Sequence, residues 1–188
     1  MNTRNELPVH VKDICGLGAQ AGASQMSEAH AVGLWQITCR DGQGNLKWIE
    51  ETRNLVVNQG LDSLLGVTLN KWTQVQTWSV LVTSGHPTVA AGDTGASHTG
   101  WVEYTGYSES IRQPWLAGAV SGQSVSNTNS KAVLSINAAG SIGGAGLISV
   151  NSKGVSGGSL YAVGSFSLKT LSSGDTLQVQ ATFTTAAS

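Results

Sequence analysis

The chain has 188 residues, with 10 Lys and Arg against 11 Asp and Glu and a formal net charge of −1. This length allows one domain with a sizeable core, but there is no cation cluster for binding phosphates and no apolar run near the roughly 18 residues of a membrane span. We therefore expect neither nucleic acid nor a membrane as partner. Only 11% of the residues are charged. Gly, Ser and Thr are abundant instead, a composition typical of short strands and tight turns. Such a surface suits a protein that packs among other proteins.

Residues 1–31 are predicted to form an N-terminal arm with a flexible connection, and residues 32–188 to form the body. In the arm, Val9 and Val11 alternate with polar residues. Such a segment can add one strand to the sheet edge of a neighbouring chain, or it can be disordered by itself, and the sequence leaves both possibilities open. Residues 16–31 are rich in Gly, Ala, Ser and Gln, a composition typical of linkers.

The stretch from Met1 to Gln20 contains no apolar core, so we expect no secretory signal. The two cysteines, Cys15 and Cys39, are too few for a disulfide framework and do not form a CxxC pair. Because cytosolic disulfides are rare, both thiols are expected to be reduced in a protein that is made in a cytoplasm.

The body is predicted to begin with a β-hairpin. Residues 34–39 alternate with the period of two that is typical of a strand, and a second strand is expected from Leu46 to Val57. Between them, residues 41–45 (DGQGN) are turn formers that tolerate a positive φ.

A single short helix is expected after the hairpin. Leu61, Leu64 and Leu65 stand at helical spacing, with Asn58 or Asp62 available as a cap. Gly66 and the β-branched residues after it are expected to end the helix early. We expect little helix elsewhere.

The remainder of the chain is predicted to be a succession of strands separated by glycine-rich breaks. In the last strand, Leu177, Val179, Ala181 and Phe183 face one way, and polar residues face the other. Because no helix is long enough for a parallel crossover, the fold class is predicted to be all-β. We expect an antiparallel two-sheet β-sandwich, jelly-roll-like, with one short helix and an extended N-terminal arm. The expected strands are residues 78–83, 132–136, 146–150, 160–168 and 176–185.

Asp93 stands in a D-T-G-A sequence, the short signature of aspartic peptidases. In those enzymes two such turns meet, and the two carboxylates share a proton. Here a weak, glycine-broken stretch precedes Asp93 and no second D-T-G follows, although a homodimer could supply one. We therefore interpret the sequence as a turn in which Asp93 bonds backbone amides and Gly95 takes a positive φ.

No catalytic, metal or cofactor site is predicted. As a metal pair, His86 and His98 lack a third ligand at familiar spacing, and no serine stands in a G-x-S-x-G sequence. Residues 140–146 (GSIGGAG) lack the spacing and the lysine of a phosphate loop. They are expected to allow a tight turn between strands or the close approach of a neighbour.

Aromatic residues crowd into residues 100–115, where two acidic residues, Glu103 and Glu109, accompany them. These rings can stack on sugars, or they can form a corner of the core in which arginine holds one of the glutamates. Core packing is the commoner use of Trp, but Trp, Tyr and Arg are also enriched at interfaces. With Val9 and Val11, the candidate interface residues are Trp101, Tyr104, Tyr107, Arg112 and Trp115.

Several phrases of the body, taken together and in order, resemble a group of virion structural proteins of tailed bacteriophages. Two are the most specific: K-W-x-E-x-x-x-N-L-V-x-N at residues 47–58, and A-x-D-T-x-x-S-H-x-G-W-x-E at residues 91–103. The likeness runs from about Val32 to Thr184. Some relatives look like cement, or decoration, proteins of the head, and the family carries no catalytic set.

The resemblance implies a non-enzymatic capsid cement protein without cofactors. It would be located on the outer surface of the head, bind the major capsid protein and associate with itself as a dimer or trimer. Two other functions stay open. One is a tail or fibre component that binds a host-surface glycan through the aromatic segment, and the other is a dimeric aspartic peptidase built on Asp93.

Overall fold

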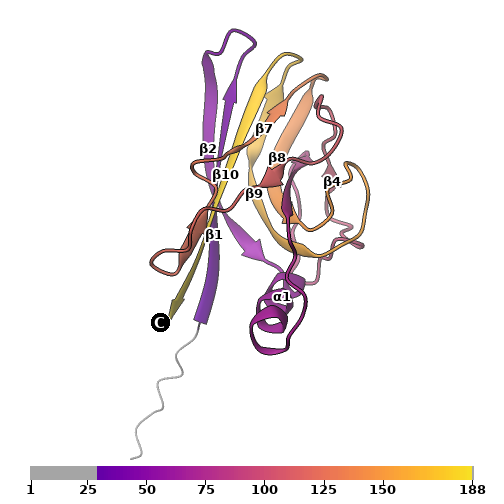
Figure 1. Ribbon diagram of the computed structural model, residues 1–188. Helices are drawn as coiled ribbons and strands as arrows, with labels where there is room; N and C mark the ends of the chain where they lie inside the picture. The colour runs from indigo at the N-terminus through magenta and orange to yellow at the C-terminus, as the bar shows by residue number, and fades with distance from the viewer. Residues whose placement is uncertain (1–28, 188) are drawn as a thin grey trace, which may run out of the picture.

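The structure is a computed structural model that describes residues 29–187 (Figure 1). The predicted arm, with Val9 and Val11, therefore lies outside the described residues except for its last positions. Residues 29–31 belong to the first strand, so regular structure begins before the boundary expected at Val32.

The described residues form a mostly antiparallel β-protein with one short helix, as the sequence predicts. Ten strands are hydrogen-bonded in the order β4-β3-β8-β9-β2-β1-β10-β6, with β5 also paired to β3 and β7 to β10. Every pairing between these strands is antiparallel. The elements are β1 (Ala29–Arg40), β2 (Leu46–Val56), α1 (Asn58–Leu69), β3 (Trp78–Ser84), β4 (Val102–Glu103), β5 (Pro114–Trp115), β6 (Ser124–Ser126), β7 (Ala132–Ser135), β8 (Gly140–Ile148), β9 (Leu160–Leu171) and β10 (Thr176–Ala187).

Strand β2 joins the two parts of this sheet. Its residues up to Arg53 pair with β1, whereas Asn54 to Val56 pair with β9. One part contains β1, β10, β6 and β7, and the other contains β9, β8, β3, β4 and β5. Both parts contribute to one hydrophobic core, in which Trp35 and Ile37 of β1 belong to the same cluster as Val80 and Val82 of β3.

The alternation predicted for the last strand is confirmed. In β10, Leu177, Val179, Ala181 and Phe183 are all buried, and the residues between them are partly exposed. Strand β3 is different, because Leu81 is as buried as its neighbours on the opposite face. Leu81 belongs to a second cluster with Val57, Trp101, Ile148, Leu160 and Val163.

The glycine-rich residues 140–146 lie within strand β8, so the expectation of a turn there is wrong and the strand begins earlier than predicted. The expectation of close approach is confirmed. A Cβ on Gly143 would lie 2.6 Å from the carbonyl oxygen of Gly85, and one on Gly144 would lie 2.7 Å from that of Gly164. Side chains at these positions would push neighbouring backbone away.

Helix α1 continues through Gly66 to Leu69, so the predicted early end is wrong. Gly66 is required for packing, because a Cβ there would lie 2.2 Å from the indole ring of Trp72. The predicted capping is also wrong. The N-cap is Val57, which makes no side-chain cap bond, and the amide of Asn58 donates instead to the carbonyl of Ala91 at 2.8 Å.

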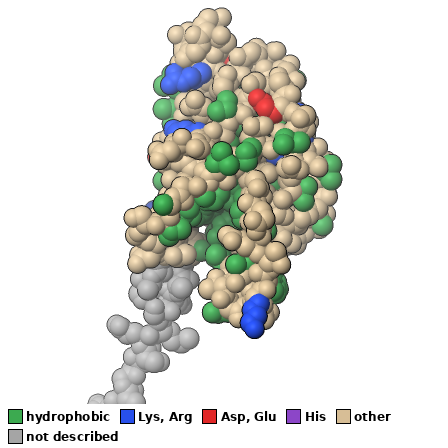
Figure 2. All heavy atoms as spheres, viewed as in Figure 1, with side chains coloured by type: hydrophobic (Ala, Val, Ile, Leu, Met, Phe, Trp, Pro, Cys, Tyr) green, Lys and Arg blue, Asp and Glu red, His purple; other side chains and the backbone are tan. Residues whose placement is uncertain are grey.

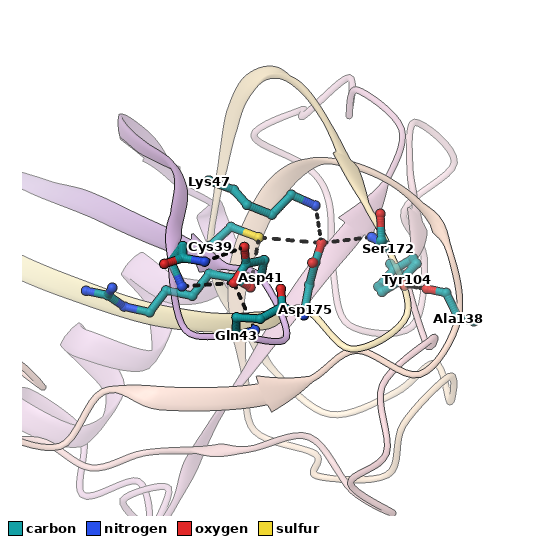
Figure 3. Close-up of polar contacts among 10 residues, drawn as sticks. Cys39, Asp41, Gln43, Lys47, Tyr104, Ala138, Ser172 and Asp175 are labelled. Atoms are coloured by element: carbon teal, nitrogen blue, oxygen red, sulfur yellow. Dashed lines mark hydrogen bonds and ion pairs between the residues drawn. The ribbon is translucent and has the colours of Figure 1, made fainter.

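A buried carboxylate connects the β1–β2 hairpin to the turn before β10 (Figure 3). Asp175 accepts a hydrogen bond from Nζ of Lys47 at 2.6 Å and another from the amide of Ser172 at 2.8 Å. The thiol of Cys39, which is free and buried, lies 3.8 Å from the same carboxylate. Burial, followed by the charge of Asp175, raises the pKa of Cys39 to about 11.

The free energy of unfolding should therefore decrease as the pH rises from 9.0, the ordinary pKa of a thiol, to about 11. In this range the thiol of the unfolded chain loses its proton while the folded thiol keeps it, so the unfolded state is favoured. Lys47, whose pKa is also raised by its bond to Asp175, contributes in the same direction at higher pH. In urea denaturation at pH 7, 9, 10 and 11, Cys39→Ser should show a shallower decrease than the unchanged chain. Equal slopes would contradict this account of Cys39.

Candidate functional site

The loop that contains Asp93 covers the second hydrophobic cluster. Asp93 is 8% exposed, and its Oδ2 accepts hydrogen bonds from Nε1 of Trp101 at 3.0 Å and from the amide of Ala90 at 3.1 Å. Trp101 is itself a member of that cluster. The carboxylate thus holds the loop to the indole, and the chain turns at this position as the sequence predicts.

The role predicted for Gly95 is wrong, because this glycine is not among those with a positive φ. It is needed for a close contact, since a Cβ would lie 2.4 Å from the carbonyl oxygen of Gly157. The amide of Gly157 donates to the carbonyl of Gly95 at 2.6 Å, and the amide of Gly95 donates to Oε1 of Gln59 at 3.1 Å. The loop is therefore held against helix α1 and the loop before β9.

The two histidines have separate partners within the protein. The ring of His98 stacks on Trp101, with centroids 3.7 Å apart and an interplanar angle of 11°. His86 Nδ1 lies 2.9 Å from the carbonyl oxygen of Phe166. Across residues 29–187, no group of three or more His, Cys, Asp and Glu side chains is arranged to hold a metal ion.

Arg112 is at the centre of the aromatic segment and is 3% exposed. It makes a two-pronged ion pair with Glu103, in which Nε and Nη2 donate at 2.9 and 2.8 Å. Its remaining donors bond the carbonyl oxygens of Val150 at 2.8 Å and Val155 at 2.9 Å. Of the two glutamates considered from the sequence, Glu103 is the partner, and Glu109 accepts the amide of Ser135 instead.

The predicted aromatic interface residues are all buried within the chain. The exposed fraction is 5% for Trp101, 7% for Tyr104, 1% for Tyr107 and 8% for Trp115. Burial raises the pKa of both tyrosines. Burial leaves little of these rings for stacking on a sugar, and their part in an interface with another molecule stays a prediction.

Trp101 and Trp115 lie at two different hollows. Trp101, Glu103 and Arg112 line one of about 670 Å³ beside strand β4. Trp115 lines another, of about 620 Å³, between helix α1 and strands β6 and β10. The second hollow is mostly apolar.

We call this second hollow, with an adjoining one of about 250 Å³, the apolar groove. Figure 2 shows apolar side chains gathered around a hollow on the viewed face, with few charged side chains nearby. Among the described residues that line the groove, none is charged. The two hollows that make up the groove share the lining residues Leu64, Val120, Val125, Tyr161 and Phe183.

Aromatic rings in edge-to-face contact form the floor of the apolar groove. The ring of Phe183 lies 5.0 Å from that of Tyr161 and 5.6 Å from that of Trp115, measured between centroids. Trp78 contacts Tyr161 at 5.5 Å, and Trp35 contacts Phe183 at 6.1 Å from the core side. Such contacts stabilise aromatic clusters beyond the area that they bury, so the floor is a well-packed surface.

Exposed aliphatic side chains form the rim of the apolar groove. Leu64 is 36% exposed, Leu116 is 54% exposed and Val120 is 74% exposed. One feature of the sequence points to this rim. Leu116 and Val120 are apolar residues in a Gly- and Ala-rich stretch that has no strand alternation. They form a groove only together with Tyr161 and Phe183, which are distant in sequence and are brought beside them by the fold.

No protein-family model matches this chain, and no curated protein matches it either. Over residues 29–187, the one helix is too short to cross a membrane.

Replacing Arg112 with Met should lower the free energy of unfolding by about 3–5 kcal/mol, because it leaves the carboxylate of Glu103 buried without its partner. Arg53→Met is the matched control, since Arg53 is exposed, and it should change stability by less than about 0.5 kcal/mol. Urea denaturation at pH 7 measures both. Equal effects of the two substitutions would show that the buried ion pair does not hold this corner together.

Replacing Asp93 with Asn should lower the free energy of unfolding by about 1–3 kcal/mol, because the amide replaces a charged acceptor of two hydrogen bonds. Asp62→Asn, at an exposed position of helix α1, is the control and should have little effect. We expect neither the unchanged chain nor the Asp93 variant to cleave peptides. Cleavage by the unchanged chain that is lost in Asp93→Asn would support the peptidase hypothesis instead.

Proposed function

We propose that this chain is a non-enzymatic bacteriophage capsid cement protein, which binds the outer surface of the assembled head and stabilises the lattice of the major capsid protein. It would act without a cofactor and as a dimer or trimer, because closed symmetric assemblies are the usual form of self-association. The observation that carries the proposal is the apolar groove, an uncharged hollow rimmed by exposed aliphatic side chains. Contiguous apolar surface of this kind marks protein–protein contact sites.

The resemblance of residues 32–184 to virion structural proteins supports the choice of the phage head over other assemblies. The low proportion of charged residues, 11%, suits a protein that lies among many neighbours. A ligand that binds only the assembled shell stabilises that state by mass action, and contacts with several subunits add avidity. Modest individual contacts, such as those of one groove, are then sufficient.

We further propose that the two parts of the sheet are the layers of a jelly-roll-like sandwich. The support is that β1 and β10 share one core cluster with β3 and β8, which is the arrangement of side chains between two facing sheets. The change of partner within β2 would then be the place where the chain passes from one layer to the other. Double-mutant cycles between core residues of β10 and β3, such as Val179→Ala with Val82→Ala, test this by their coupling energy.

The first test of the cement role is the copy number of this chain in purified phage particles, by quantitative mass spectrometry against the major capsid protein. We expect a fixed proportion to the shell subunits. A handful of copies per particle would indicate a tail or fibre component instead, and complete absence would show that the protein is not part of the virion.

The second test asks whether the apolar groove contacts the head. Leu116→Asp places a charge at its rim, and Leu46→Asp is a matched control because Leu46 is similarly exposed, 52% against 54%, but does not line the groove. In sedimentation with heads that lack this protein, Leu116→Asp should weaken binding by about tenfold or more, or 1.4 kcal/mol. Equal binding by both variants would show that the contact lies elsewhere.

A further inference from the structure

The apolar groove opens beside the point where the described residues begin. Strand β1 starts at Ala29, and both Ala31 and Val32 line the smaller hollow. At this end β1 has no strand beside it on the β2 side among the described residues, because its pairing with β2 begins only at Leu34. The first described residues therefore lie beside the groove.

The described residues leave a large part of the apolar groove uncovered. A third hollow of about 210 Å³, which shares Leu64, Trp78 and Tyr161 with the hollow of about 620 Å³, extends the groove along helix α1. Trp72 lines this extension and is 52% exposed. Exposed apolar patches of this kind often mark sites of contact. An apolar and uncharged segment is the occupant that such a lining fits.

One stretch of the segment before Ala29 has this chemistry. Residues 7–11, Leu-Pro-Val-His-Val, contain no formally charged side chain, whereas Glu6 and Lys12 flank them. In an extended backbone, Leu7, Val9 and Val11 point to the same side. The proline also favours an extended conformation, since its ring restricts φ and it has no amide to leave unpaired.

We propose that residues 7–11 bind in the apolar groove of their own chain, with the aliphatic side chains against the aromatic floor. The groove of the same chain is the expected site, because residues 12–28 connect the segment to it. For a connection of about 17 residues with this Gly-, Ala- and Ser-rich composition, polymer statistics give a root-mean-square span of about 20–25 Å. A segment tethered at that distance has an effective concentration in the millimolar range, far above that of a second copy in dilute solution.

This contact would cover the apolar rim in the free protein, and it does not depend on the cement role. A partner that uses Leu116 and Val120 would have to displace residues 7–11, so the same groove would be closed in the free chain and open in the assembly. The contact would be present in the isolated protein, so it can be tested without phage particles.

Photo-cross-linking of the full chain tests the position of the segment. With benzoylphenylalanine in place of Val9, we expect cross-links within the monomer to peptides that contain Leu64, Val120 or Val125. The same group in place of Gln20 is the control and should give scattered products. Cross-links that join two chains would show that a second copy occupies the groove, and a pattern like that of the control would show no specific site; either result would overturn the proposal.

A second measurement follows the exposure of the groove. The full chain with Val9→Asp and Val11→Asp should bind the dye ANS with several-fold higher fluorescence, because charged side chains leave the apolar surface. Asn2→Asp with Asn5→Asp adds the same charge to the same terminal segment and should not change the signal. Thermal unfolding of both variants checks that the body is intact. Unchanged fluorescence in the valine variant, with an intact body, would refute the proposal.

Discussion

The change of partner within strand β2 is the constraint on which the rest of the structure depends. Up to Arg53 the strand extends the β1 part of the sheet, and from Asn54 it extends the β9 part. The chain then enters helix α1 directly, so the helix is placed at the end of the β9 part. Because β2 leaves, the start of β1 is paired with β10 alone (Figure 1). The apolar groove lies between these strands and the helix.

Buried polar side chains hold the segments that lack regular structure. Asp93 fixes the loop over the second cluster, and the pair of Arg112 and Glu103 fixes the corner beside β4. Asn127 acts similarly near β10, where its side chain bonds the carbonyl of Val179 at 3.1 Å and the amide of Ala181 at 2.8 Å. Such buried hydrogen bonds join each loop to another segment of the chain. Loops whose sequences show no secondary-structure pattern are therefore held in a fixed position by side chains.

Local patterns predicted the parts of this fold that local physics determines. The hairpin around residues 41–45, the alternation in β10 and the one helix follow from turn chemistry and periodicity, and the structure contains them. Local patterns failed where tertiary contact decides. Gly66 and Gly95 were interpreted by backbone preference, but the structure needs them for close packing against Trp72 and Gly157. The short strands β4, β5 and β6 have too few residues for any alternation to be visible.

The candidate site was predictable only in its components. Trp115 was recognised as a possible contact residue, but the groove that it lines also needs Tyr161 and Phe183, which are far from it in sequence. Trp101 and Trp115 come from one aromatic segment, yet the fold places them at two different hollows. Closeness in sequence is a poor guide to which side chains meet in a sheet whose neighbouring strands are set by long-range pairing.

The pairing of β1 with β10 has a consequence for how the protein is made. These strands are in register along their whole length, from Ala29 with Ala187 to Arg40 with Thr176, so the first described strand completes its sheet only with the last. During synthesis, the indole of Trp35 has no Phe183 to pack against until the chain has left the ribosome as far as β10. A nascent chain of this topology exposes apolar strands until β10 has been made, and such transiently exposed strands are prone to aggregation.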